Sequence, residues 1–228
     1  MKIGSKISIL LLAICQNGWG QGFLNLNFES ANPSGYIPGN NNLPTGAAFP
    51  GWTAYYSSAS GTNIASTVYY DSVSAGGAAI FLEDSNAPSG GGPLPLQGNY
   101  SVLLEGASGV FGSNPTTASI GQTGTIPNTA QSLTFLGNLG GTVLVSFNGQ
   151  PLSFMAISNT LNYTIWGADI SAYAGQTGQL LFTATLQRGA LLDDIQFSSL
   201  PVPEPAEFAL AVLGASILGF HYRRNRPW

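Results

Sequence analysis

Val143-Leu144-Val145-Ser146-Phe147-Asn148-Gly149-Gln150-Pro151-Leu152-Ser153-Phe154 is the stretch that decides the fold. Two short apolar runs flank an Asn-Gly pair. An Asn-Gly turn places both of its central residues at positive φ, and its twist matches the twist of two paired strands. The stretch therefore predicts a β-hairpin.

The same kind of short apolar run, rich in Val, Ile, Thr, Tyr and Phe, recurs between clusters of Gly, Asn, Pro and Ser along the chain. At most one helical turn is expected before Ala206, around Ala168–Gly175. Two long loops are expected, Ala31–Pro50 and Asp84–Gly98, and the second is either a simple connection or the rim of a binding face. We expect strands near Phe23–Glu29, Trp52–Tyr56, Thr67–Asp71, Ala78–Glu83, Tyr100–Glu105, Thr117–Gln122, Gln131–Leu136, Thr142–Phe147, Leu152–Ile157, Leu161–Ile170, Gln179–Leu186 and Ala190–Ser198.

These strands predict an all-β domain over residues 21–200, built as a two-sheet antiparallel sandwich of the jelly-roll type. That range contains one cation, Arg188, and eight carboxylates, which gives a formal charge of −7. Such a surface cannot neutralise phosphates, so nucleic acid is excluded as a partner. Charged residues are few overall, and many Ser, Thr, Asn, Gln and Gly residues make most of the surface uncharged and polar. Such a surface suits uncharged partners such as glycans, and it is also common in secreted β proteins.

The first 20 residues predict a signal peptide. Lys2 and Lys6 precede the apolar run Ile7–Cys15, and Gly18-Trp19-Gly20 offers small residues for cleavage after Gly20. A buried first helix and a lipidated Cys15 are the alternatives. Cleavage after Gly20 removes the only cysteine and with it any disulfide or thiol chemistry.

Residues 201–228 carry three signals in a fixed order. Pro203-Glu204-Pro205 interrupts any helix, the apolar run Ala206–Phe220 follows, and Arg223, Arg224 and Arg226 end the segment. The run is at or just below the ~17–25 residues of a membrane-spanning helix, and the arginines would stay on the cytoplasmic side. The alternative is a buried C-terminal helix.

This arrangement resembles the PEP-CTERM sorting signal of exported bacterial proteins. The resemblance covers only the C-terminal segment, and it departs from the family at Ala206, where Ser or Thr is common. It implies processing near Pro203-Glu204-Pro205 by an exosortase, a membrane-bound transpeptidase-like enzyme. It also implies anchoring in the cytoplasmic membrane during export, followed by a place at the cell surface or in an extracellular polysaccharide matrix.

The two ends of the central domain resemble those of carbohydrate-binding-module and galactose-binding-like jelly rolls. The matching segments are Asn25–Glu29 with Gly51-Trp52, and Ala190–Phe197. The resemblance implies that the first and last strands pair and that carboxylates there hold a structural calcium ion. The candidate ligands are Glu29, Asp193 and Asp194, since calcium takes six to eight hard oxygen ligands. Otherwise Asp193 and Asp194 simply face opposite sides of the strand.

Catalysis is not expected. The only histidine, His221, lies in the C-terminal segment, which excludes Ser-His-Asp and Cys-His mechanisms and histidine-based metal sites from the domain. Glycoside hydrolysis needs only two carboxyl groups across a cleft. Asp71, Glu83, Asp84 and Glu105 are the candidates for such a pair.

Two adjacent tyrosine pairs, Tyr55-Tyr56 and Tyr69-Tyr70, offer aromatic rings for stacking on a sugar. Neighbouring residues on a strand face opposite sides, so one ring of each pair points outward. Tyr56 and Tyr70 are the candidate sugar contacts, and Trp52 and Trp166 are expected in the core. The alternative is that each pair is a core ring beside an ordinary surface tyrosine. The leading interpretation is an exported, non-enzymatic surface or matrix protein; the alternatives are a carbohydrate-binding module and, less favoured, a glycosidase or lyase.

Overall fold

The computed structural model describes residues 22–72, 76–87, 91–107, 116–140, 143–185 and 189–202. The predicted signal peptide over 1–20 and the predicted membrane helix with its arginines lie outside the described residues. The hairpin predicted at Asn148-Gly149 is confirmed. Strand β9 (Val143–Phe147) pairs with β10 (Gln150–Leu152), and the two turn residues have φ values of 49° and 75°.

The hairpin forms one edge of the smaller sheet. This six-stranded antiparallel sheet has the order β10-β9-β13-β7-β2-β3. Its other strands are β13 (Thr177–Ala184), β7 (Thr117–Thr125), β2 (Thr53–Ser58) and β3 (Gly61–Ile64).

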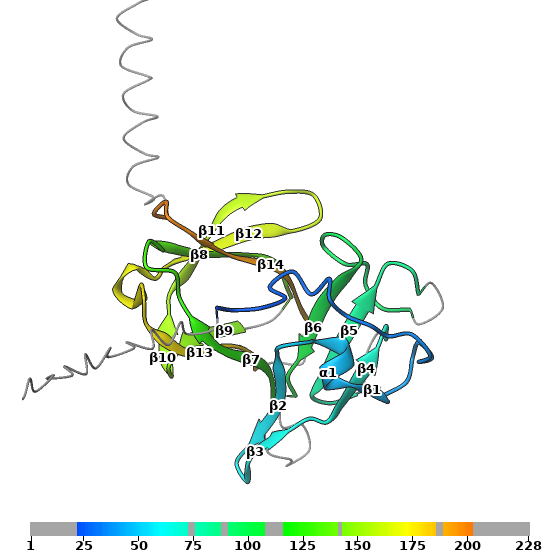
Figure 1. Ribbon diagram of the computed structural model, residues 1–228. Coiled ribbons are helices and arrows are strands. Elements are labelled where there is room, and N and C mark those ends of the chain that lie inside the picture. The colour runs from blue at the N-terminus through cyan, green and yellow to red at the C-terminus, as the bar shows by residue number, and fades with distance from the viewer. Residues whose placement is uncertain are drawn as a thin grey trace, which may run out of the picture.

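The larger sheet has eight strands in the order β1-β4-β5-β6-β14-β8-β12-β11. Its β4–β5 pair is parallel, and its other pairs are antiparallel. The last strand of the fold, β14, lies inside this sheet between β6 and β8 (Figure 1). The strands are β1 (Leu43–Pro44), β4 (Thr67–Tyr70), β5 (Ala79–Asp84), β6 (Tyr100–Glu105), β8 (Ser132–Leu139), β11 (Phe154–Asn159), β12 (Thr164–Asp169) and β14 (Ala190–Ser198).

The two sheets enclose the main hydrophobic core, so the predicted all-β sandwich is confirmed. Aromatic rings dominate this core, and the rings of Phe135 and Phe182 meet edge to face at 5.4 Å. Edge-to-face contacts of this kind add stabilisation beyond the area that they bury. The largest fully buried side chains include Phe28, Phe49 and Phe147.

A second, smaller cluster covers the opposite face of the larger sheet. Its buried members are Ala79, Phe81, Leu103 and Leu191, and Tyr69 and Leu96 pack against it. Strand β5 is therefore buried along its whole length, with Ile80 and Leu82 in the main core and its alternate residues in the second cluster. Glu83, which is considered below, lies on this outer face, two residues after Phe81.

The strand predicted over Phe23–Glu29 is wrong. The segment is a series of turns, because Asn25 (φ 49°) and Phe28 (φ 58°) adopt left-handed conformations that interrupt an extended chain. Tertiary bonds hold it there: the Trp52 indole N–H donates to the Asn25 carbonyl at 3.0 Å. Contacts with the last strand remain: the Ile195 N–H donates to the Leu26 carbonyl at 2.9 Å, and the Phe23 and Phe197 rings lie 5.1 Å apart.

Other differences are local. The expected loop over Ala31–Pro50 contains β1 and the short helix α1 (Thr45–Ala48), and β3 was not expected. The expected strand over Leu152–Ile157 is divided at Ser153, so that β10 and β11 belong to different sheets. The expected helical turn is present as the 3₁₀ helix η2 (Ser171–Tyr173).

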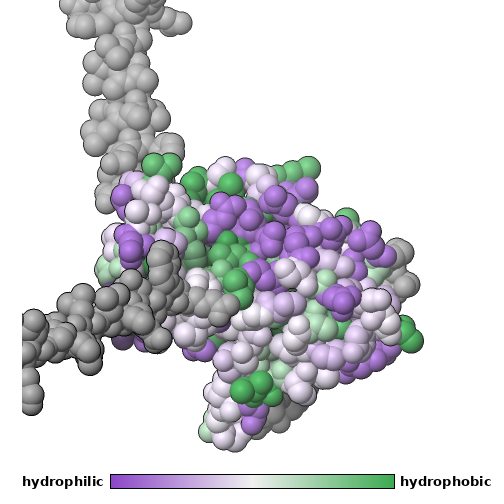
Figure 2. All heavy atoms as spheres, in the orientation of Figure 1, coloured by the Kyte–Doolittle hydropathy of each residue, from purple (hydrophilic) through white to green (hydrophobic). Residues whose placement is uncertain are grey.

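The face of the molecule shown in Figure 2 is mostly polar or weakly polar, and its hydrophobic residues form small separate patches. Single exposed apolar residues of this kind are normal on soluble domains. Within the part of the chain that the structure describes, no helix has the length and apolar character to cross a membrane.

Candidate functional site

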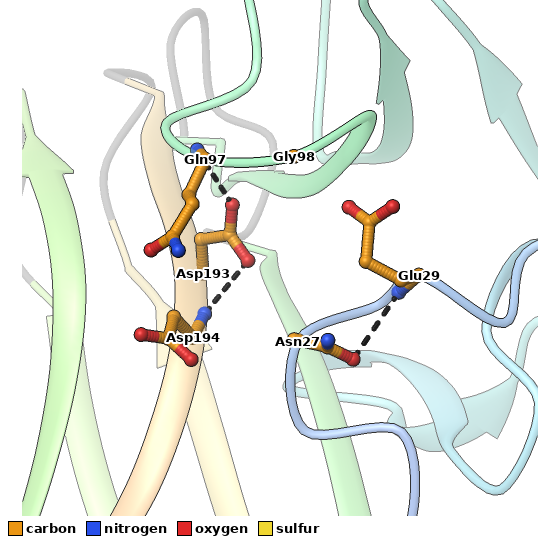
Figure 3. Close-up of a pocket in the computed structure, with 6 residues that line it drawn as sticks. All are labelled: Asn27, Glu29, Gln97, Gly98, Asp193 and Asp194. Carbon is orange, nitrogen blue, oxygen red and sulfur yellow. Dashed lines mark hydrogen bonds between the residues drawn. The ribbon is translucent and has the colours of Figure 1, made fainter.

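The three predicted calcium ligands lie in one small cleft. Glu29 comes from the N-terminal turns and Asp193 and Asp194 from β14, and the cleft is completed by Asn27, Gln97 and Gly98. Figure 3 shows Glu29 and Asp193 beside the segment that carries Gln97 and Gly98, with the Asp194 carboxylate pointing away from Glu29. The side chain of Asp194 instead accepts a bond from the Gln196 amide at 2.6 Å.

Glu29 holds the segment before β6 from one side. Its Oε1 accepts the backbone N–H groups of Asn99 at 2.8 Å and Tyr100 at 3.0 Å, and its Oε2 accepts the Asn99 side-chain amide at 3.1 Å. Gly98 has φ 63°, and a Cβ at this position would collide with the Glu29 carboxylate. The turn therefore requires glycine both for its backbone and for the approach of Glu29.

Asp193 holds the same segment from the other side. Its Oδ2 accepts the Gln97 N–H at 3.0 Å and the Ser101 hydroxyl at 2.7 Å, and its Oδ1 accepts the Asp194 N–H at 2.7 Å. The side chain is 1% exposed. Burial raises the pKa of Asp193 to about 6, and the hydrogen bonds from Ser101, Asp194 and Gln97 oppose that shift.

The calcium ion expected here stays a prediction. Calcium requires six to eight oxygen ligands, whereas N–H and O–H donors already occupy the oxygens of Glu29 and Asp193. Among the residues that the structure describes, no group of three or more His, Cys, Asp and Glu side chains could hold a metal ion. In the structure, the hydrogen bonds that Glu29 and Asp193 accept hold the segment leading into β6 in place.

The predicted sugar contacts, Tyr56 and Tyr70, face the wrong way. Both belong to the main core: Tyr70 is 6% exposed and Tyr56 packs against the core from β2. Alternation along each strand therefore turns their neighbours, Tyr55 and Tyr69, to the outer faces. Tyr69 stacks on Phe81 at 5.1 Å in the second cluster, which leaves Tyr55 as the ring on an open face.

Tyr55 lines a shallow hollow on the outer face of the smaller sheet. The Gln179 amide donates to the Tyr55 hydroxyl at 3.2 Å, and the Ser119 and Thr183 hydroxyls bond at 2.9 Å on neighbouring strands. This surface combines one aromatic ring with uncharged hydrogen-bonding groups. The hollow is lined by Tyr55, Ser57, Thr62, Ser119, Gln179 and Leu181.

The four carboxyl groups considered for glycoside hydrolysis are all buried, and they separate into different environments. Asp84 is on the core side of β5 and accepts the Tyr70 hydroxyl at 2.8 Å. Glu105 is opposite Ala79, at the far end of the β5–β6 pair. Asp71 and Glu83, by contrast, lie together at the ends of β4 and β5.

Glu83 is the exceptional member of this set. Its side chain is fully buried, and within the described part of the chain no N–H group or hydroxyl donates to either carboxyl oxygen. Burial first, and the neighbouring charge of Asp71 second, raise the pKa of Glu83 to about 9. The sequence separation of Asp71 and Glu83 does not show that they lie together. A glutamate directly after the apolar run Ala79-Ile80-Phe81-Leu82 is, however, a sequence signal for a buried carboxyl group.

The sorting residues cannot be placed. Pro203, Glu204, Pro205, Arg223, Arg224 and Arg226 lie outside the described residues. The structure describes the chain as far as Val202, where Ser132 Oγ donates to the Leu200 carbonyl at 2.7 Å. The last strand and its following turn therefore end directly before the predicted motif.

Comparisons with known proteins add little. No protein-family model matches the chain, and no curated protein does. Among solved structures, the chain is similar to the enzymatically active domain of tailspike protein 4 from bacteriophage CBA120, with 13% identity and a TM-score of 0.40. The match covers 72% of this chain and 21% of the phage chain.

This comparison contradicts the expectation of a non-catalytic domain, because the matched structure is described as enzymatically active. The expectation rested on the absence of histidine from the domain, which excludes imidazole chemistry only. Carboxyl groups alone can carry acid–base catalysis. The non-catalytic assignment is withdrawn, and the description of the phage protein transfers no substrate and no residue role to this chain.

Proposed function

We propose that this chain is an exported protein whose β-sandwich acts at the cell surface or in an extracellular matrix. The signal peptide over 1–20 directs export, and an exosortase-type enzyme processes the chain at Pro203-Glu204-Pro205. Until then, the apolar run after the motif anchors the chain in the cytoplasmic membrane. Extracellular polysaccharide is the proposed surrounding of the mature domain.

The order of motif, apolar run and arginine cluster is the observation that carries this proposal. The first and last residues of the described fold give independent support. Gly22 forms a bridge with Thr125, directly after the predicted first cleavage, and β14 ends at Ser198, shortly before the motif. The proposed cleavage sites therefore lie just before the first and just after the last of the described residues, Gly22 and Val202.

The test is the intact mass of the protein in each cell fraction of its own host. We expect an extracellular or surface species that begins near Gln21 and ends near Val202. A variant with both Pro203→Ala and Pro205→Ala should accumulate in the membrane fraction at a higher mass. Glu207→Gln, which removes a charge near the motif, is the matched control and should be processed normally. A wild-type species that keeps Arg223–Trp228 and stays in the membrane would refute the proposal.

A second candidate function, binding of an uncharged glycan, is favoured by the hollow around Tyr55. A tyrosine ring can stack on a sugar, and the Ser, Thr and Gln side chains beside it can hydrogen-bond sugar hydroxyls. The decisive comparison is a glycan array probed with wild type, Tyr55→Ala and Tyr163→Ala. Tyr163 follows β11, outside the hollow, so Tyr163→Ala should bind like wild type while Tyr55→Ala loses binding. Equal binding by both variants would exclude the hollow as the glycan site.

A further inference from the structure

A pair of acidic side chains on the outer face of the larger sheet has no role in the proposed function. Asp71 directly follows β4 and Glu83 lies in β5, the strand that runs parallel beside it. The Asp71 N–H donates to the Leu82 carbonyl at 2.8 Å, which continues the pairing and places Asp71 next to Glu83. Asp71 has φ 45°, a conformation that aspartate tolerates better than most residues.

The two carboxyl groups converge on one point beside Gly92. A Cβ built on Gly92 would overlap Glu83 Oε2 and lie 3.1 Å from Asp71 Oδ1. Any residue other than glycine at position 92 would therefore push into both carboxyl groups. Gly92 therefore lies directly against the pair, with its backbone close to both carboxyl groups.

Glu83 is a buried acidic side chain for which the described residues supply no balancing positive charge. It is fully buried, and among the described residues no N–H group or hydroxyl donates to either of its oxygens, whereas Glu29 and Asp193 accept such bonds. Asp71 Oδ1 accepts the Asp84 N–H at a long 3.4 Å. A buried carboxylate is costly unless it is paired or bound to a metal. The described residues include no lysine, arginine or histidine, so no described basic side chain can balance this charge.

We propose that Asp71 and Glu83 bind a hard divalent cation of the calcium class beneath Gly92. Carboxylate and main-chain oxygens, without nitrogen or sulfur ligands, are the donors that calcium and magnesium prefer. The described side chains offer only two carboxylates here, so main-chain carbonyls and water complete the coordination. The ion replaces the missing cationic partner and ties β4, β5 and the segment around Gly92 together.

Calorimetric titration of chelator-treated protein from its own host with CaCl₂, and separately with MgCl₂, tests this site. We expect one equivalent of calcium to bind and the Tm to rise with the logarithm of the calcium concentration. Glu83→Gln should abolish the binding and the rise in Tm. Because Glu83→Gln removes a buried acid that folding keeps protonated at a cost in stability, its Tm without calcium should equal or exceed that of chelator-treated wild type.

Glu29→Gln is the matched control, because it disturbs the other cleft and leaves Asp71 and Glu83 unchanged. It should retain the equivalent of calcium that Glu83→Gln loses. Asp71→Asn provides a second test if Glu83→Gln does not fold. The proposal is overturned if wild type binds neither cation, in which case the two carboxyl groups share a proton. It is also overturned if Glu29→Gln loses the ion while Glu83→Gln keeps it.

Discussion

The Tyr70 hydroxyl joins the main core to the buried end of β5. It donates to Asp84 Oδ2 at 2.8 Å, while Asp84 Oδ1 accepts the Asn86 N–H at 2.7 Å. Burial, and then the hydrogen bond to Asp84, raise the pKa of the Tyr70 hydroxyl well above its ordinary value. The hydroxyl is therefore protonated at neutral pH and donates this bond.

Tyr70→Phe should destabilise the domain by about 1–3 kcal/mol, because it leaves a buried carboxyl oxygen without its donor. The free energy of unfolding in urea is the measurement. Tyr55→Phe, which removes a hydroxyl from the open hollow on the smaller sheet, should cost much less. Equal losses in the two variants would show that Asp84 finds another donor when Tyr70 is changed.

Asp169 gives a prediction about pH. Its Oδ1 accepts the Ser171 N–H at 2.8 Å, and this bond lowers the pKa of the exposed Asp169 carboxyl below its ordinary value. A lowered pKa in the folded state stabilises the fold above the ordinary value near 4, and the stabilisation is lost as the pH falls through the folded-state pKa.

Asp169→Asn should therefore be less stable than wild type at pH 7, by less than about 1 kcal/mol since the group is exposed. The difference should shrink toward zero at pH 3. Urea unfolding of both proteins at the two pH values measures it. A difference that is the same at pH 3 and pH 7 would mean that the charge of Asp169 plays no part.

Among the elements, the β9–β10 hairpin shows how a turn and a neighbouring strand support each other. Asn148 Oδ1 accepts the Gln179 N–H at 3.0 Å, so the turn residue is also bonded to β13. Gly149 has φ 75°, and a Cβ at this position would meet nothing within 4 Å. A substitution there changes only the backbone energy.

Gly149→Ala should cost about 1–2 kcal/mol, the penalty of a left-handed conformation for a residue with a Cβ. Gly46→Ala in α1 is the matched control: it also meets open space, but without positive φ. There the smaller entropy of the unfolded chain should leave stability unchanged or raise it by up to about 1 kcal/mol. The Tm should fall for Gly149→Ala and stay level or rise for Gly46→Ala, and a similar fall in both variants would contradict this account.

Short runs of β-prone residues between clusters of turn residues made most strands predictable from sequence, and some strands also alternate. In β13 every second residue is buried, and that period survives in the sequence of the strand. The segment over Phe23–Glu29 has a similar composition, but bonds to distant residues such as Trp52 select its turns. Alternation likewise showed that one tyrosine of each pair faces out, but only the second cluster and the packed core decide which one.

The candidate site was less predictable than the fold for the same reason. The cleft with Glu29, Asp193 and Asp194 could be anticipated from short motifs at the two ends of the domain. The segment around Gly98 that satisfies those carboxyl groups could not, because it comes from an expected loop. The approach of Gly92 to Asp71 and Glu83 depends on the path of that same loop over the larger sheet.

For the molecule as a whole, the shortage of cations sets the response to salt. Residues 21–200 carry one cation and eight carboxylates, so dissolved salt screens a net repulsion among the negative charges of the folded domain. In the presence of a chelator, the Tm should therefore stay level or rise slightly as NaCl increases from 20 to 500 mM. Thermal unfolding followed by circular dichroism measures it, and a fall in Tm would reveal attractive ion pairs that dominate the stability.

The central position of β14 has a consequence for when folding can finish. A chain that emerges from a ribosome or crosses a membrane N-terminus first delivers this strand last, and β6 and β8 have no common neighbour until it arrives. Pairings between residues so distant in sequence form slowly. The larger sheet can therefore be completed only after Ala190–Ser198 has appeared, so the part of the chain made before it must wait for its last strand.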